Sequence, residues 1–265
     1  MVSSADPDAG APVGTFRSVS LTDIGRKRDH NEDSFLVNEQ LGLFVVCDGM
    51  GGHAGGETAS RLAVLTIERE LISARLRDDD PFLVDGAIAD TPLAGALREA
   101  IEGACAAVFR AARLNPHLQG MGTTCISLLV QRDMALLGHV GDSRAYAVRD
   151  GEVTQLSEDH SLVNEQVRAG LLTAEEARHS RLKNIITRSV GFEEDVLVDV
   201  IGFATLPGDK YVLCSDGLAN LVSSEEIRDH LARFKIEDAP RELVALANER
   251  GGDDNITVVA VERVE

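Results

Sequence analysis

Short apolar runs separated by turn residues dominate the chain from residue 16 onward. Runs of this length, bounded by Gly, Asp, Asn and Ser, are typical of β-strands. We therefore predict nine strands, over residues 16–21, 34–37, 43–47, 124–130, 134–140, 144–148, 196–203, 211–214 and 256–261.

Apolar residues with helical spacing fill two long stretches, 56–76 and 93–113, neither of which contains a proline. A second group of predicted helices covers residues 161–169, 173–179, 224–234 and 239–249. The strands come in runs and do not alternate strictly with helices, which favours an α+β fold with an antiparallel sheet and helices packed on its faces. A doubly wound parallel sheet is the second choice.

The extent of the periodic apolar pattern along the chain predicts the domain boundaries. Residues 1–14 are rich in Ala, Ser, Asp, Pro and Gly and show no periodicity, so we predict a disordered tail followed by one domain over 15–265. The stretch 77–91 contains three consecutive aspartates and is predicted to be an exposed loop.

Composition narrows the classes of function. With 44 acidic and 26 basic residues the formal net charge is −18, which repels phosphate backbones and anionic lipids. The four cysteines form no C-x-x-C pair, so neither a zinc site nor a disulfide framework is indicated. No apolar run reaches the roughly 20 residues that span a bilayer, and the first residues do not resemble a signal peptide. We therefore expect a cytoplasmic protein without nucleic-acid or membrane partners.

Carboxylates recur where the predicted strands end or begin. Asp48-Gly49 and Asp216-Gly217 each follow an apolar run. Asp142 follows a third run, Asp254 precedes the last strand, and Arg28, Glu32 and Asp33 lie just before another. Any one Asp-Gly alone is best interpreted as an ordinary turn.

The recurrence of these carboxylates has a chemical consequence. If they gather at neighbouring strand ends, they repel one another and their pKa values rise unless a cation neutralises them. Carboxylate oxygens suit Mg²⁺ or Mn²⁺, which keep several bound waters, and do not suit zinc.

A glycine-rich loop over residues 49–56 offers a competing interpretation. Gly49-x-Gly51-x-x-Ala54, between a strand and a helix, matches a variant of the dinucleotide-binding fingerprint, with Glu68 and Glu70 near the ribose position. That hypothesis leaves the other aspartates at strand ends unexplained. A P-loop is excluded because no Gly-Lys-Ser/Thr follows. A cysteine-dependent phosphatase is excluded because none of the four cysteines is followed by an arginine six positions later.

Seven segments in fixed order carry a family resemblance: TDIGRKRDHNEDSF, VVCDGMGGHAGGE, GMGTTC, GHVGDSRAY, DHSLV, LCSDGL and GGDDNITVV. Together they resemble the bacterial branch of the metal-dependent PPM/PP2C protein serine/threonine phosphatases. The resemblance implies a four-layer α-β-β-α sandwich, with a central antiparallel β-sandwich and a dinuclear Mn²⁺ or Mg²⁺ site between the sheets. It also implies hydrolysis of phosphoserine and phosphothreonine monoesters by direct attack of a metal-bridging water.

The resemblance assigns metal-site roles position by position. Asp48 matches the ligand that bridges the two ions, and Gly49 matches a carbonyl ligand. Asp216 and Asp254 match ligands of the first metal, and Asp33 matches the acidic residue that holds metal-bound water.

Four further roles come from the same resemblance. Glu32 falls on a position that contributes to the metal shell in some members. Asp142 matches the residue that joins Asp216 around a weaker third metal. Arg28 matches the phosphate-binding arginine, and His53 matches a histidine proposed as the general acid.

The segment 160–188 resembles the family's mobile flap beside the active site. The resemblance further implies that the partners are phosphorylated proteins, substrates of a cognate Ser/Thr kinase, and we expect a monomer. Two alternatives stay open: a catalytically silent regulator of the same fold that binds phosphoproteins, and a dinucleotide-binding oxidoreductase.

Overall fold

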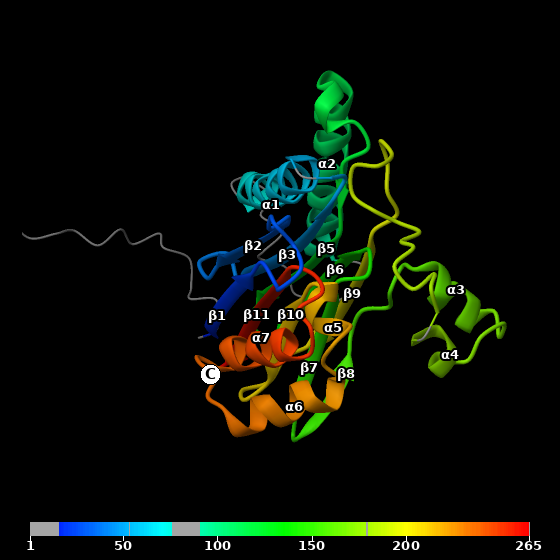
Figure 1. Ribbon diagram of the computed structural model, residues 1–265. Helices are drawn as coiled ribbons and strands as arrows, with labels where there is room; N and C mark the ends of the chain where they lie inside the picture. The colour runs from blue at the N-terminus through cyan, green and yellow to red at the C-terminus, as the bar shows by residue number, and fades with distance from the viewer. Residues whose placement is uncertain (1–15, 53, 76–90, 179, 265) are drawn as a thin grey trace, which may run out of the picture.

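The computed structural model describes residues 16–52, 54–75, 91–178 and 180–264 of the 265-residue chain. Two antiparallel sheets pack face to face (Figure 1). Sheet A contains, in order across the sheet, β1 (Phe16–Asp23), β11 (Ile256–Arg263), β10 (Lys210–Cys214), β7 (Arg144–Arg149) and β8 (Glu152–Gln155). Sheet B contains β2 (Asp33–Asn38), β3 (Leu43–Met50), β5 (Cys125–Gln131), β6 (Met134–Val140) and β9 (Asp199–Ala204), with the short β4 (Gly122–Thr123) paired to β3.

Helices cover the outer face of each sheet. On sheet B lie α1 (Ala54–Arg75) and α2 (Pro92–Leu114), followed by the 3₁₀ turn η3 (Pro116–Leu118). On sheet A lie α5 (Asp216–Ala219), α6 (Ser224–Arg233) and α7 (Ala239–Glu249). Two short helices, α3 (Leu162–Arg168) and α4 (Ala174–Arg178), project away from the sandwich (Figure 1). The predicted four-layer sandwich is therefore confirmed.

Strand β3 shows why the apolar runs are continuous. Leu43, Val45 and Cys47 pack toward helices α1 and α2, whereas Phe44 and Val46 pack into the core between the sheets. All five are fully buried, because a strand inside a four-layer fold has helices on one face and a second sheet on the other. Continuous apolar runs, which alone cannot separate parallel from antiparallel sheets, here belong to an antiparallel sandwich.

The named strands pair in antiparallel fashion throughout, so the doubly wound parallel sheet is wrong. The predicted strand 196–203 begins later, at Asp199. The apolar pattern does not reveal strand β8, because three of its four residues are exposed. It does not reveal helix α5 either, because four residues are too few to show a period.

Other expectations concern thiols, membranes and termini. All four cysteines are free and buried. Within the described part of the chain, no helix combines the length and apolarity needed to cross a membrane. The predicted tail 1–14 lies outside the described residues, as does the predicted loop 77–91 except for Thr91, which caps α2.

The core between the sheets should dominate stability. Leu128 of β5 is fully buried in it, so Leu128→Ala should lower the free energy of unfolding by about 2–5 kcal/mol, measured by urea denaturation. The matched control is Leu114→Ala at the end of α2, where the side chain is 85% exposed and the change should stay below about 0.5 kcal/mol. Equal losses in the two variants would contradict this account of the core.

Candidate active site

Five aspartates from both sheets meet at one end of the sandwich. Asp33 begins β2 and lies directly opposite Asp48 in the β2–β3 register. Asp142 lies in the turn after β6, Asp216 begins α5 just after β10, and Asp254 lies just before β11. Burial raises the pKa of the Asp48 carboxyl, and the other four aspartates lie close enough to raise it further. The structure thus brings together the five aspartates that the sequence singled out.

The backbone around Asp48 is fixed by neighbouring threonines. Its N–H donates to Thr124 Oγ1 at 2.9 Å, and its carbonyl accepts from Thr124 N at 2.9 Å and from Thr123 Oγ1 at 2.8 Å. At Gly49 an added Cβ would lie 2.1 Å from the Gly56 carbonyl oxygen, so only glycine lets the end of β3 pack against the first turn of α1. The two residues after the apolar run are therefore placed by contacts with distant segments.

Asp33 connects the two sheets. Its Oδ2 accepts hydrogen bonds from Ser215 Oγ at 2.8 Å and from Thr257 Oγ1 at 2.6 Å. Thr257 N in turn donates to Ser215 Oγ at 2.9 Å. The sequence reasoning missed Ser215 and Thr257; the only signal was that each lies close in the chain to a residue already singled out.

Asn255 holds the loop that carries Arg28. Its Oδ1 accepts from Glu32 N at 2.8 Å, and its Nδ2 donates to the carbonyls of Ile24 and His30 at 3.0 and 2.9 Å. These bonds keep the loop between β1 and β2 against the start of β11.

The same loop places Arg28 beside Asp254. Arg28 Nη2 lies 2.5 Å from Asp254 Oδ2, although the arginine side chain is half-exposed. A guanidinium therefore lies at the edge of the carboxylate cluster. Asn255 was a missed residue whose signal was its place beside Asp254.

The carboxylates are electrostatically strained. Burial, with the nearby charges of Asp216 and Asp254, raises the pKa of Asp33 to about 7. Burial and Asp216 raise the pKa of Asp142 to about 7. Burial and Asp254 raise the pKa of Asp216 to about 6. Several negative charges in one buried place require either protons or a cation.

The donor set fits a hard divalent cation. Asp33 Oδ1 and Asp216 Oδ1 are buried, and neither has a hydrogen-bond partner within the described residues. In the same part of the chain, no group of three or more Asp, Glu, His or Cys side chains is arranged to hold a metal ion without other ligands. Spaced carboxylates that leave room for water suit Mg²⁺ and Mn²⁺, which bind few protein ligands and retain water.

Two other predicted residues have different outcomes. Glu32 Oε2 lies against the first turn of α1, since a Cβ added to Gly56 would be 2.3 Å from it. Burial lowers the pKa of Arg28, and Asp254 raises it. The Glu32 carboxylate is also near enough to raise this pKa, but by less than Asp254 does. His53 lies outside the described residues.

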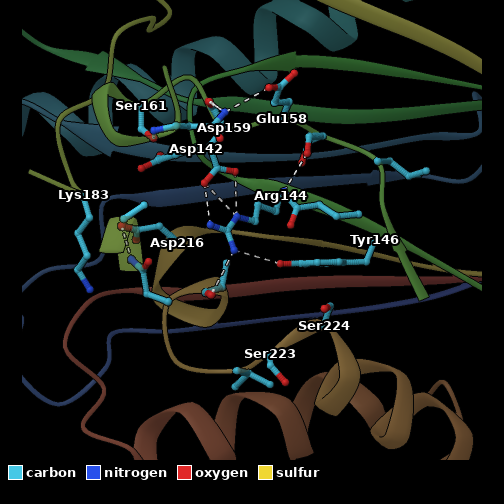
Figure 2. A pocket seen from close by; sticks show the side chains of 18 of the residues that line it. Asp142, Arg144, Tyr146, Glu158, Asp159, Ser161, Lys183, Asp216, Ser223 and Ser224 are labelled. Atoms are coloured by element: carbon cyan, nitrogen blue, oxygen red, sulfur yellow. Dashed lines mark hydrogen bonds and ion pairs between the residues drawn. The ribbon is translucent and has the colours of Figure 1, made fainter. Parts of the chain in front are cut away.

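A cavity of about 1100 Å³ opens beside the cluster, between the segment 160–188 and the start of α6 (Figure 2). Asp142 and Asp216 lie in its lining, together with Lys183. Arg144 and Asp159 form a two-point ion pair there, with Nε–Oδ1 and Nη2–Oδ2 distances of 2.9 and 2.7 Å. This pair was missed, although both residues lie in or beside segments that carry the family resemblance.

Residues 25–248 match the family described as Protein phosphatase 2C. The chain belongs to the protein phosphatase 2C family. It is 37% identical over 248 residues to the serine/threonine phosphatase stp of Listeria welshimeri, covering 91% of this chain and 94% of that one. It is 35% identical to the serine/threonine protein phosphatase PstP of Mycobacterium tuberculosis, covering 94% of this chain but only 45% of PstP.

Solved structures of protein phosphatase 2C relatives share the fold. The crystal structure of M. tuberculosis PstP/Ppp matches with a TM-score of 0.83 at 34% identity, over 94% of this chain and 99% of that one. A PstP catalytic domain described in complex with two manganese ions matches with a TM-score of 0.80 at 35% identity, with the same coverage.

The dinucleotide hypothesis is wrong for this protein phosphatase 2C member. Its glycine loop does follow a strand and precede a helix, as the fingerprint requires. However, β3 pairs with β2 and β5 in antiparallel fashion, whereas the dinucleotide fold needs parallel neighbours around that strand.

The raised pKa values predict a pH effect in protein freed of divalent cations by EDTA. The folded-state pKa of Asp33 is about 7 and the unfolded value is near 4, so its contribution to stability is full below about pH 4 and is lost as pH rises to about 7. Asp33→Asn removes this loss. Relative to wild type, the variant should therefore gain roughly 1.4 kcal/mol in free energy of unfolding per pH unit in that window, measured by urea denaturation. Parallel pH profiles for the two proteins would show that Asp33 is not buried among like charges.

Proposed function

We propose that this chain hydrolyses phosphoserine and phosphothreonine monoesters in proteins with the help of divalent cations. The observation that carries the proposal is the meeting of five carboxylates from two sheets, with the Arg28 guanidinium at their edge. Curated relatives named serine/threonine phosphatases support the substrate class.

The cation sites are assigned by position in the cluster. We place two Mn²⁺ or Mg²⁺ ions, and a weaker third, among these residues; the relative described with two manganese ions supports the first two. When bound, such ions lower the pKa of water and offset negative charge on a phosphoryl group. The residues that would hold them are Asp48, the Gly49 carbonyl, Asp216 and Asp254, with Asp33 in the outer shell and Asp142 beside Asp216 for the third ion.

Arg28 orients the substrate. A guanidinium binds two phosphoryl oxygens at once, which fixes the phosphorus relative to the cluster. Its present partner, Asp254, holds it at the edge of the cluster with its side chain half-exposed, so the fork can be reached from solvent. Asn255 supports this placement by bonding the loop on both sides of Arg28.

The leaving serine or threonine alkoxide needs a proton. We assign this role to His53, on the family resemblance of the glycine loop. Asp33 contributes differently, because its two hydroxyl donors hold Oδ2 and leave Oδ1 as an acceptor without a protein partner in the described structure.

The proposal extends to partners and cellular setting. We infer that the partners are phosphoproteins made by a cognate serine/threonine kinase, that the chain works as a monomer and that it acts in the cytoplasm of a bacterium. Bacterial relatives named serine/threonine phosphatases support the bacterial source and the phosphoprotein substrates.

Asp216 tests the cation-dependent reaction. Asp216→Asn should lower Mn²⁺-stimulated turnover of p-nitrophenyl phosphate and of a phosphothreonine peptide by roughly 100-fold, because a ligand between two cation sites loses its charge. The control is Asp229→Asn on α6, whose side chain is 66% exposed and pairs with Arg228 of the same helix. Its turnover should match wild type.

The same assay separates the alternatives. A wild-type protein with no Mn²⁺-stimulated turnover, but with binding to a phosphoprotein, would instead be the silent regulator. Calorimetric titration of Mn²⁺ distinguishes these outcomes independently, since a regulator need not bind two ions.

Arg28 tests substrate orientation. Arg28→Lys keeps the charge but loses the two-point contact, so the KM for p-nitrophenyl phosphate should rise about tenfold. Arg26→Lys, two residues away on the same exposed loop, is the matched control and should leave KM unchanged. An equal KM in wild type and Arg28→Lys would remove Arg28 from the phosphate site.

A further inference from the structure

The segment 160–188, which we call the flap, is closed at its base by backbone hydrogen bonds. Thr187 N donates to the His160 carbonyl at 2.8 Å, and Leu162 N donates to the Ile185 carbonyl at 2.9 Å. Helices α3 and α4 lie between these stems and stand apart from the sandwich (Figure 1). His160 is therefore the first residue of the flap and part of its base.

His160 also binds the turn that carries Asp142. Its backbone N–H donates to the Gly141 carbonyl at 2.8 Å, and its ring Nδ1 accepts from Gly141 N at 3.0 Å. Gly141 has a φ of +109°, and a Cβ there would lie 2.7 Å from Thr124 Cβ. The turn is thus pressed against Thr124 on one side and bonded to His160 on the other.

The opposite edge of the imidazole is bonded to Asp199, which also binds Arg188 at the far end of the flap. His160 Nε2 lies 3.0 Å from Asp199 Oδ2, and Arg188 Nη1 lies 2.9 Å from Asp199 Oδ1. Because Nδ1 accepts the Gly141 N–H, the ring proton is on Nε2 and is donated to Asp199. One side chain therefore connects the Asp142 turn, the last flap residue and the start of β9.

A second histidine restrains the ring. The ring centroids of His139 and His160 are 4.6 Å apart, and both side chains are almost fully buried. Burial lowers the pKa of His139 to about 3 and also lowers that of His160. Both shifts favour the neutral imidazole, in which Nδ1 of His160 can accept a hydrogen bond.

We propose that His160 is a positioning residue that fixes Asp142 beside Asp216 and couples this placement to docking of the flap base. The inference rests on the proposed function in one respect: Asp142 is taken to bind a divalent cation. It adds a residue that contacts neither cation nor phosphate and acts through the Gly141 N–H.

Two substitutions separate the two edges of the ring. In His160→Asn the amide oxygen can take the place of Nδ1, which keeps the acceptor for Gly141 and loses the contact with Asp199. In His160→Gln the longer amide can reach Asp199 and leaves Gly141 N–H without its acceptor. His160→Ala removes both contacts, and the Asn and Gln pair remains decisive if the Ala variant does not fold.

The first measurement is hydrogen exchange at the Gly141 amide, by NMR on protein without divalent cations. Exchange should be about tenfold faster in His160→Gln than in wild type, because a buried donor loses its partner. In His160→Asn it should stay within about twofold of wild type. Equal exchange in the two variants would overturn the assignment of Nδ1 as the group that fixes the turn.

The second measurement is the Mn²⁺ concentration for half-maximal turnover of p-nitrophenyl phosphate. It should rise about tenfold in His160→Gln, with KM changed less, since residues that orient a ligand cost about this much in metal affinity. In His160→Asn the Mn²⁺ concentration for half-maximal turnover should stay near the wild-type value. Unchanged Mn²⁺ dependence in His160→Gln would overturn the coupling to Asp142, whereas absence of turnover in wild type would overturn the proposed function and leave the exchange result valid.

Discussion

Repulsion among carboxylates buried between two sheets is the interaction on which this protein's site depends. Burial raises the pKa values of Asp33, Asp48, Asp142 and Asp216, and the charge of at least one neighbouring aspartate raises each of them further. A fold that holds these charges together must compensate elsewhere, and here the apolar core between the sheets and the hydroxyl donors to Asp33 do so. This repulsion favours cation binding, because a divalent ion offsets the negative charges that would otherwise have to be neutralised by protonation.

The architecture makes this concentration of charge possible. Antiparallel strands reverse at the sandwich edge, so strand ends and strand beginnings from both sheets meet there. Asp33 and Asp48 are direct partners in sheet B, whereas Asp216 and Asp254 flank neighbouring strands of sheet A. The Ser215 and Thr257 hydroxyls connect the two sheets through Asp33. The position of one sheet relative to the other therefore also sets the geometry of the site.

The flap extends this logic to the substrate side. Its base is bonded to the turn that carries Asp142, and its inner side lines the cavity in which Asp142 and Asp216 lie (Figure 2). The base of the flap and the turn that carries Asp142 are therefore held by the same residue, His160. In chemical terms, a segment beside the cavity is mechanically connected to a residue of the carboxylate cluster through the imidazole of His160.

Local signals in the chain were enough to predict the strands with strong apolar runs, the longer helices and the aspartates at strand ends. They did not reveal β8, which is exposed, or α5, which is too short. The polar groups that support the site became visible only once the chain was folded: Ser215 and Thr257 reach Asp33 across 182 and 224 residues of sequence, and His160 reaches Asp199 across 39. Such pairings depend on how the two sheets pack and on where the chain rejoins the sandwich after the flap. That geometry results from all the core contacts together, and no single segment of the sequence encodes it.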